Sequence, residues 1–393
     1  MNRAMSARPG LGRLHFLDSL RGFAALYVIA FHLLALPRPA PTMPIWAIRR
    51  LLEFGGTGVF LFFLISGFSL SFTMNRHDRT AFPGLSYGLS RFFRIVPLFY
   101  VLIAVHVARA AFLNFHRPPY DPAPTGLDAI VNGAMIFNLF PYKQEGIVWA
   151  SWTIGVEMLF YLMFLPIYRW GVKFRIALFC LAAAGFDIFA VICDALYPQY
   201  QNLLYLFFGG FVSFFVLGML TYDAFVALET RPNSRAWGHA LGWSGLAALI
   251  GIALMKDSGT DIVLRPAIGL AYAALLVGCA LCRPKALESR ALRYYGALSY
   301  SVYLLHPLVV WYSAPLFAWL IGNAWPAMAY GGALLWCYGV VTALATLTYF
   351  GIEKPGIRLG ARVFEAIMAR KAGPPASAYA PPTTPGPVVD RTW

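Results

Sequence analysis

The sequence predicts an all-α membrane protein that crosses the bilayer about ten times. Of its 393 residues, 59% are hydrophobic and only 12% are charged, whereas soluble domains average about 25% charged residues. The hydrophobic residues gather in stretches of about 20, the length that a helix needs to cross a bilayer. So few charges could not cover a soluble globule of this size, which excludes a soluble, disordered or coiled-coil protein.

The predicted spans follow from the positions of these apolar stretches. They run near 15–36, 58–75, 95–113, 150–168, 176–196, 203–222, 237–255, 262–282, 298–321 and 328–351. The first is not a cleaved signal peptide, because it contains Arg21 and His32 and lacks a small-residue cleavage site. The stretch 127–141 is too short to span comfortably, so we expect a re-entrant or interfacial helix there.

Both ends of the chain fall outside these spans. We expect a cytoplasmic arm over 1–14, a transmembrane domain over 15–352 and a cytoplasmic tail over 353–393. Glu353 lies two residues before Pro355, a pattern that predicts the end of the last helix. The end of the tail is rich in Pro, Ala and Thr, which predicts disorder.

The positions of the basic residues predict the orientation in the membrane. With these spans, 22 of the 31 lysines and arginines lie on the side of the N-terminus, 6 on the opposite side and 3 within spans. Because cytoplasmic loops carry an excess of Lys and Arg, both termini are predicted to be cytoplasmic. The topology also accounts for the net charge of +14, so the sequence indicates no nucleic-acid partner.

Familiar soluble-enzyme and metal-site motifs are absent from the sequence. The five cysteines lie mostly within apolar stretches and have no metal-site spacing with the seven histidines. There is no glycine-rich phosphate loop, no HExxH and no GxSxG motif. The sequence therefore predicts no metal ion, and chemistry must come from polar residues within the membrane domain.

Three ionisable residues lie in the first span, where such residues are costly and are functional candidates. Arg21 and His32 are eleven residues apart, about three helical turns, so they share a face and lie about 16 Å apart along the axis. Asp18 precedes Arg21 by three residues and can pair with it. The alternative is that Asp18 and Arg21 are interfacial anchors and that His32 is a structural histidine.

The third and fourth spans add further candidates. Arg91 and Arg94 are neighbours on a helix face at the cytoplasmic boundary, where paired guanidinium groups suit phosphates; ordinary positive-inside residues are the alternative. Glu157 lies about seven residues into the fourth span, where a carboxylate must be neutral, paired or facing a wet cavity. Trp152, near the outer end of this span, can also be an interface aromatic.

The ninth span begins with several hydrogen-bonding groups. Ser301, Tyr303 and His306 lie in its cytoplasmic third. Ser301 can instead bond to the backbone of its own helix. His306 precedes Pro307 and can instead fill the hydrogen-bonding position that a proline leaves in a helix. Both alternatives stay open at the level of the sequence.

Six segments of the sequence, which contain most of the candidate residues above, together resemble the membrane acyltransferase family 3, the O-acetyltransferase-like enzymes of bacterial envelope polysaccharides. Each segment is weakly specific alone, but all occur in the order typical of the family over about residues 14–360. The segments are LDSLRGFAALYVIAFH, FFLISGFSLS, RFFRIVPLFY, SWTIGVEMLFY, LSYSVYLLHPLV and IEKPGIRL. The chain looks like the stand-alone form, without the fused hydrolase-like domain that some members carry.

The resemblance implies a multi-pass O-acyltransferase in the bacterial inner membrane. It implies that an acyl group, usually acetyl, moves from cytoplasmic acyl-CoA to a hydroxyl of an extracytoplasmic or lipid-linked glycan, such as an exopolysaccharide or lipopolysaccharide. His32 would be the catalytic histidine and Glu157 the buried acid of the family, while Arg21, Arg91 and Arg94 would bind acyl-CoA. Supporting roles are expected for Asp18, Trp152, Ser301, Tyr303 and His306.

The expected partners are membrane lipid, acyl-CoA as donor substrate and a glycan acceptor, with no tightly bound cofactor. A neutral imidazole suits His32 for general-base catalysis near pH 7, and acceptor specificity is expected in the outer loops 37–57 and 114–149. Succinyl transfer is an alternative within the family. A transporter or flippase for a glycan or anionic substrate would use the same buried residues as a path, and a scaffold would use them only for helix packing.

Overall fold

The computed structural model describes residues 14–113, 124–197, 201–255 and 264–372, and all regular structure in these ranges is helical. The longer helices are α1 (His15–Ala35), α3 (Gly58–His77), α4 (Pro83–Leu113), α6 (Trp152–Arg169), α7 (Gly171–Leu196), α9 (Val212–Glu229), α10 (Ser234–Met255), α11 (Arg265–Cys282), α12 (Arg290–Tyr312), α14 (Pro326–Thr348) and α15 (Lys354–Ala372). The shorter elements are α2 (Trp46–Glu53), η1 (Phe54–Thr57), α5 (Gly126–Gly133), η2 (Phe137–Leu139), α8 (Gln201–Leu206), η4 (Phe208–Phe211), η6 (Lys285–Glu288), α13 (Ala314–Asn323) and η7 (Tyr349–Glu353).

The helices confirm the prediction of an all-α protein with many membrane spans. Within the described ranges, eight helical segments are long and apolar enough to cross a membrane, and the bent pair α12–α13 raises this number to nine if it forms one span. The remaining predicted span, 150–168, coincides with α6, which is not among them. Its 18 residues include Glu157, Pro166 and Arg169.

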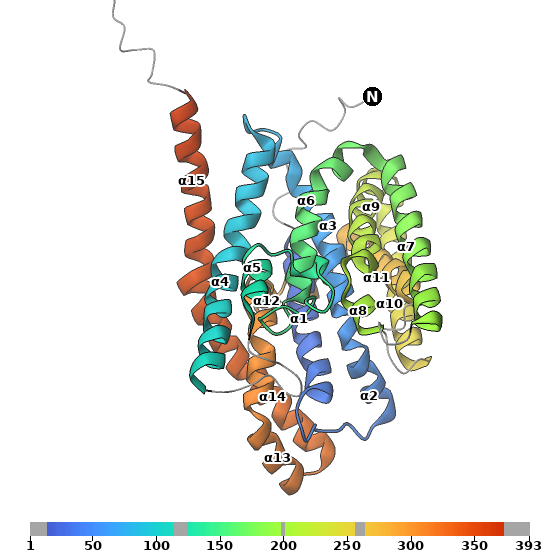
Figure 1. The fold of residues 1–393 in the computed structure, drawn as a ribbon. Coiled ribbons are helices and arrows are strands. Elements are labelled where there is room, and N and C mark those ends of the chain that lie inside the picture. Colours follow the sequence, from blue (N-terminus) through green and yellow to red (C-terminus); the bar gives the residue numbers. More distant parts are fainter. Residues whose placement is uncertain (1–13, 114–123, 198–200, 256–263, 373–393) are drawn as a thin grey trace, which may run out of the picture.

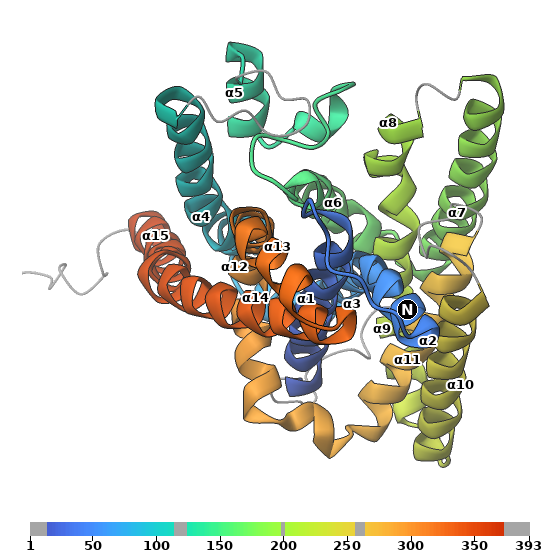
Figure 2. The ribbon, with the colours of Figure 1, turned by 90° about the horizontal axis from the view of Figure 1, so that it is seen from below.

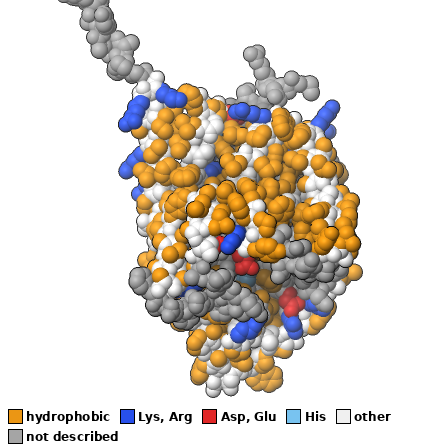
Figure 3. Space-filling view, viewed as in Figure 1, with side chains coloured by type: hydrophobic (Ala, Val, Ile, Leu, Met, Phe, Trp, Pro, Cys, Tyr) orange, Lys and Arg blue, Asp and Glu red, His pale blue; other side chains and the backbone are white. Residues whose placement is uncertain are grey.

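The helices form one bundle with a polar centre and apolar flanks. In Figures 1 and 2, α4 and α15 stand at one edge, α7, α9, α10 and α11 at the other, and α1, α3, α6 and α12 between them. The flank seen in Figure 3 is mostly hydrophobic, as a surface in contact with lipid requires, and basic side chains cluster at its upper end. Which side of the membrane that end faces stays a prediction.

The central helices approach one another closely at glycines. Gly296 of α12 lies against the backbone of α1, and a Cβ at this position would clash with the carbonyl oxygen of Asp18. Gly218 of α9 likewise lies against the carbonyl of Leu64 in α3. Small residues at such crossings are typical of helix packing in membranes. Gly296 thus brings α12 against α1, which also packs against α3 and carries three of the candidate site residues, Asp18, Arg21 and His32.

Three local predictions were wrong or incomplete. The predicted span 298–321 is bent by 60° between α12 and α13. The chain does not leave the helix before Pro355, because a π-turn, η7, joins α14 to α15, and the helix continues to Ala372; the predicted tail is therefore helical over 354–372, and 373–393 lie outside the described residues. The stretch 127–141 forms two short pieces, α5 and η2, instead of one helix.

Candidate active site

A polar cavity lies at the centre of the bundle, between α1, α3, α4, α6 and α12. Its volume is about 80 Å³, enough for several water molecules. The polar side chains that line it are Arg21, Ser66, Ser69, Arg91, Arg94, Thr153, Glu157, Tyr161, Ser299, Tyr300 and Tyr303. Three guanidinium groups in one cavity within a membrane bundle form a site that favours an anion.

Arg21 is held in place by neighbours on two helices. Its Nη2 donates a hydrogen bond of 2.8 Å to Ser69 Oγ on α3. Its Nη1 lies 3.6 Å from the Asp18 carboxylate, one turn earlier on α1, as the three-residue spacing predicts. These contacts use only part of the guanidinium, which has five N–H donors. The side chain is therefore fixed and still has donors for a ligand in the cavity.

Arg91 and Arg94 enter the cavity from one face of α4. The Arg91 guanidinium lies 5.9 Å from the centre of the Tyr161 ring, a cation–π distance. Both arginines are close enough to Arg21 for mutual electrostatic repulsion. An anion bound between the three groups would relieve this repulsion.

Glu157 faces the same cavity from α6. It accepts a hydrogen bond from the Tyr161 hydroxyl, one turn later on α6, and a longer one of 3.4 Å from Ser66 Oγ on α3. Glu157 therefore adds an acceptor to a cavity that is otherwise lined mainly by donors.

Glu353 is a buried acid that sequence reasoning assigned only to a helix end. It lies in η7 with no exposed surface, accepts a hydrogen bond from Ser301, and is within electrostatic range of Arg94. Thr348 Oγ1 in turn donates to Ser301 Oγ at 2.9 Å. Ser301 therefore does not line the cavity; it connects Glu353 to the bundle. The signal in the sequence was a carboxylate directly after a long apolar span.

His32 and His306 form a pair beside the cavity. His306 Nε2 lies 3.0 Å from His32 Nδ1, and the two ring centroids are 4.8 Å apart. Neither ring lines the cavity. Tyr303 does line it, and its ring centroid is 5.5 Å from that of His306. Phe62, also in the lining, packs edge-on against Tyr303. One aromatic layer thus separates the histidine pair from the arginines.

The structure brings half of the predicted site residues to the cavity lining. Arg21, Arg91, Arg94, Glu157 and Tyr303 line it together. The other five predicted residues lie behind them: Asp18 beside Arg21, Ser301 beside Glu353, the pair His32 and His306 behind Tyr303, and Trp152 between Phe63 and Phe211.

Several lining residues were not predicted. Ser66 and Ser69 are three residues apart within an apolar span, and Tyr161 follows Glu157 by four. Both spacings place the paired residues on one face of a helix, a signal that could have indicated shared polar faces. Which face points inward depends on packing against neighbouring helices, which spacing alone does not give.

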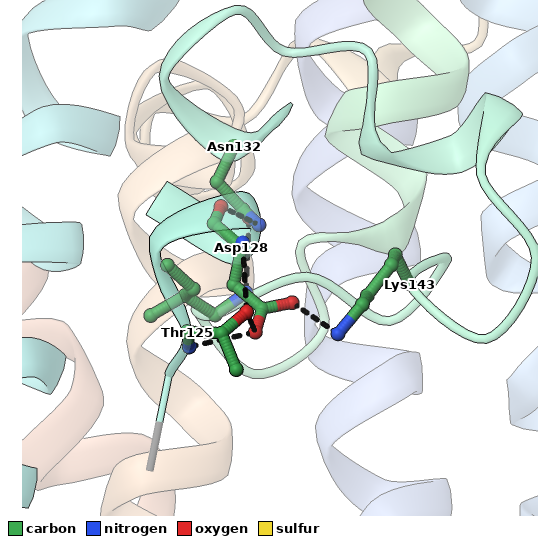
Figure 4. Close-up of polar contacts among 5 residues, drawn as sticks. Thr125, Asp128, Asn132 and Lys143 are labelled. Atoms are coloured by element: carbon green, nitrogen blue, oxygen red, sulfur yellow. Dashed lines mark hydrogen bonds and ion pairs between the residues drawn. The ribbon is translucent and has the colours of Figure 1, made fainter. Parts of the chain in front are cut away.

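A loop segment that the sequence predicts to lie on the outer side is fixed by the polar contacts drawn in Figure 4. Thr125 and Asp128 form a capping box at the start of α5, and Lys143 lies 2.8 Å from the Asp128 carboxylate. Burial tends to raise the pKa of Asp128, but hydrogen bonds from Lys143 and Thr125 outweigh it and hold the pKa below its usual value. Asn132 donates to the Asp128 carbonyl oxygen at 2.9 Å. Part of the loop predicted to determine specificity is therefore rigid; 114–123 lie outside the described residues.

Comparison with known proteins agrees with the resemblance seen in the sequence. A family model described as an acyltransferase domain matches residues 14–350. The chain is 25% identical over 382 residues to Acyltransferase MdmB of Streptomyces mycarofaciens, covering 89% of this chain and 93% of that protein. It is 28% identical over 368 residues to Nodulation protein 10 of Rhizobium leguminosarum bv. viciae, covering 87% and 93%. No solved structure matches the chain significantly.

Proposed function

Because the chain belongs to the membrane acyltransferase family 3, we propose that it transfers an acyl group from acyl-CoA to a hydroxyl group of a glycan. The single observation that carries this proposal is the cavity in which three arginines and a glutamate meet. Acetyl is the proposed group, and succinyl is the alternative that the same cation cluster would accept. The proposed location is the inner membrane of a bacterium.

The arginines are the proposed binding site for the donor. Coenzyme A carries phosphate groups, and planar guanidinium forks bind phosphates through paired, charge-assisted hydrogen bonds. Arg21, Arg91 and Arg94 supply three such forks around one cavity. We expect the cavity to take a phosphate or the pantetheine arm of the donor. The proposal requires the arginines to face the cytoplasm, in agreement with the predicted topology.

His32 is the proposed general base. Its imidazole would accept the proton of the acceptor hydroxyl as the oxygen attacks the thioester carbonyl carbon. When the tetrahedral intermediate collapses, the C–S bond breaks and the proton passes from His32 to the sulfur of coenzyme A. The products are the ester and the free thiol, so protons and electrons balance.

The acyl group has to pass one aromatic layer in this scheme. Phe62 and Tyr303 lie between the cavity and the histidine pair. Tyr303 is a hydroxyl donor at that point, and we propose that the thioester carbonyl passes close to it. Glu157, on the cavity side, is the proposed acceptor for hydroxyl groups of the substrate.

Transfer of labelled acetyl groups tests the proposal. Inverted membrane vesicles would receive acetyl-labelled acetyl-CoA, and label in the glycan fraction would be measured for the parent protein, His32→Ala and His239→Ala. His239 is an exposed histidine on α10 and serves as the matched control. Transfer by the parent and His239→Ala, but not by His32→Ala, is expected. Normal transfer by His32→Ala would overturn its role as base, and no use of acetyl-CoA or succinyl-CoA with acceptor present would overturn the proposed reaction.

A further inference from the structure

We propose that His306 is a positioning residue: together with the Val28 carbonyl it accepts the Nδ1–H of His32, which fixes the tautomer of His32 and leaves its Nε2 free to accept a proton. The inference rests on the proposed role of His32 as base and assigns a partner to it. It starts from the histidine pair between α1 and α12, in which His306 Nε2 lies 3.0 Å from His32 Nδ1. His306 has no exposed surface, so we expect it to act on the reaction through its contact with His32 and not by touching the substrate.

The orientation of His306 follows from the proline after it. In a regular helix the N–H of residue 307 would bond to the carbonyl of Tyr303, but Pro307 has no N–H. His306 Nδ1 lies 2.6 Å from that carbonyl oxygen and takes the vacant place. Because a carbonyl only accepts, Nδ1 must carry the hydrogen. The local backbone therefore fixes both the direction of the His306 ring and its donor atom.

The tautomer of His32 follows by the same reasoning. His32 Nδ1 lies 3.0 Å from the carbonyl oxygen of Val28, one turn earlier on α1, so it must also be a donor. The atom that faces it, His306 Nε2, must then be an acceptor, which makes His306 neutral. His32 Nδ1–H is shared between these two acceptors. The remaining nitrogen, His32 Nε2, carries the lone pair that general-base catalysis needs.

The pair also stabilises the charge that catalysis creates. When His32 Nε2 takes the proton of the hydroxyl, the ring becomes an imidazolium, and its Nδ1–H bond to His306 Nε2 becomes charge-assisted. A neutral acceptor at this position stabilises the cation, as a carboxylate does in a catalytic triad. The proton later leaves from Nε2 to the thiolate, and His306 keeps its own proton throughout.

The packing of the two helices makes this arrangement rigid. α1 and α12 lie in direct contact along their length, and Gly22 and Gly296 allow their backbones to approach. A catalytic group must be held to within about 0.5 Å of its productive position. Two histidines on closely packed helices meet this requirement better than residues on loops.

Two substitutions of His306 test the inference. The glutamine of His306→Gln can place an amide oxygen where Nε2 accepts, whereas the leucine of His306→Leu has similar bulk and no acceptor. We expect His306→Leu to lower kcat about 10- to 100-fold, the effect of one charge-assisted hydrogen bond, with the KM for acyl-CoA unchanged. His306→Gln is expected to restore most of kcat. Val310→Ala, a buried change one turn after His306 on the same helix that removes no hydrogen-bonding group, should leave kcat nearly unchanged.

The pattern of kcat and KM separates positioning from packing. A packing role predicts that His306→Gln, His306→Leu and Val310→Ala lower folded yield together, with no rescue by glutamine. Pro307→Ala is a second test, because it restores a backbone N–H that competes with His306 Nδ1 for the Tyr303 carbonyl; it should lower kcat and leave KM unchanged. Parent-like kcat in both His306→Leu and Pro307→Ala would overturn the inference. If His32→Ala were inactive in the same experiment, the proposed function would still stand.

Discussion

Replacing Arg21 with glutamine is expected to weaken acyl-CoA binding far more than it slows the chemical step. Arg21 lines the cavity and is held by Ser69 at 2.8 Å and Asp18 at 3.6 Å, so its guanidinium is preorganised for an anion. A hydrogen bond to a charged group contributes about 1.5–3 kcal/mol, and about 1.36 kcal/mol corresponds to a factor of ten. Loss of one phosphate contact should therefore raise KM about 10- to 150-fold, with kcat within about threefold.

The same change also removes the cation next to Asp18. Breaking a fully buried ion pair costs about 3–5 kcal/mol, but these side chains are 24% and 13% exposed, so the cost here should be lower. The double variant Asp18→Asn/Arg21→Gln removes the carboxylate as well and should recover thermal stability without recovering KM. Arg21→Lys keeps the charge but loses the planar fork, so its KM should lie between those of the parent and Arg21→Gln.

Initial rates in inverted vesicles over a range of acyl-CoA concentrations give both constants, and thermal unfolding in detergent gives the stability. A KM that stays at the parent value in Arg21→Gln would refute the assignment of the cavity to the donor. Recovery of KM in the double variant would mean that Arg21 only neutralises Asp18.

Three further outcomes follow from particular contacts. Gly296→Ala should lower stability by about 1–3 kcal/mol, seen as a lower unfolding temperature, since its Cβ meets the backbone of α1. Glu353→Gln should lower the KM for acyl-CoA severalfold, because it removes a negative charge beside Arg94 that repels an anionic ligand; an unchanged KM would show that Glu353 does not act on the donor site. Lys143→Met should lower stability at pH 6, where the lowered pKa of Asp128 stabilises the fold. This loss should shrink as the pH falls below the ordinary value of 3.8 and through the folded pKa.

Most of the helices could be predicted because a bilayer imposes both their length and their composition. Two of the three errors occurred at prolines. Pro315 begins α13 after a bend, since proline is well suited to the first turn of a helix. Pro355 lies in the first turn of α15, directly after η7, where the helix continues by way of a π-helical turn. From the sequence alone, a proline that starts a helix and one that ends a helix look alike.

The candidate site could be predicted in part. Charged residues in apolar spans are conspicuous, so Arg21 and Glu157 were found by their cost. Arg91 and Arg94 were found by their three-residue spacing at the boundary of a span. Spacing placed Arg21 and His32 on one face of a helix, but it could not show that an aromatic layer separates His32 from the cavity, since that layer comes from α3 and α12. Contacts between distant segments, such as His32 with His306, depend on helix packing and not on local pattern.

In the proposed reaction, acyl groups enter from the cytoplasmic side, where the arginines are predicted to lie, and reach a glycan by way of His32. Sealed inverted and right-side-out vesicles that carry the same amount of protein test this route most directly. With labelled acetyl-CoA outside, inverted vesicles should transfer label to glycan, while right-side-out vesicles and inverted vesicles with His32→Ala should not. Equal transfer in both orientations, or transfer by His32→Ala at the parent rate, would contradict this route.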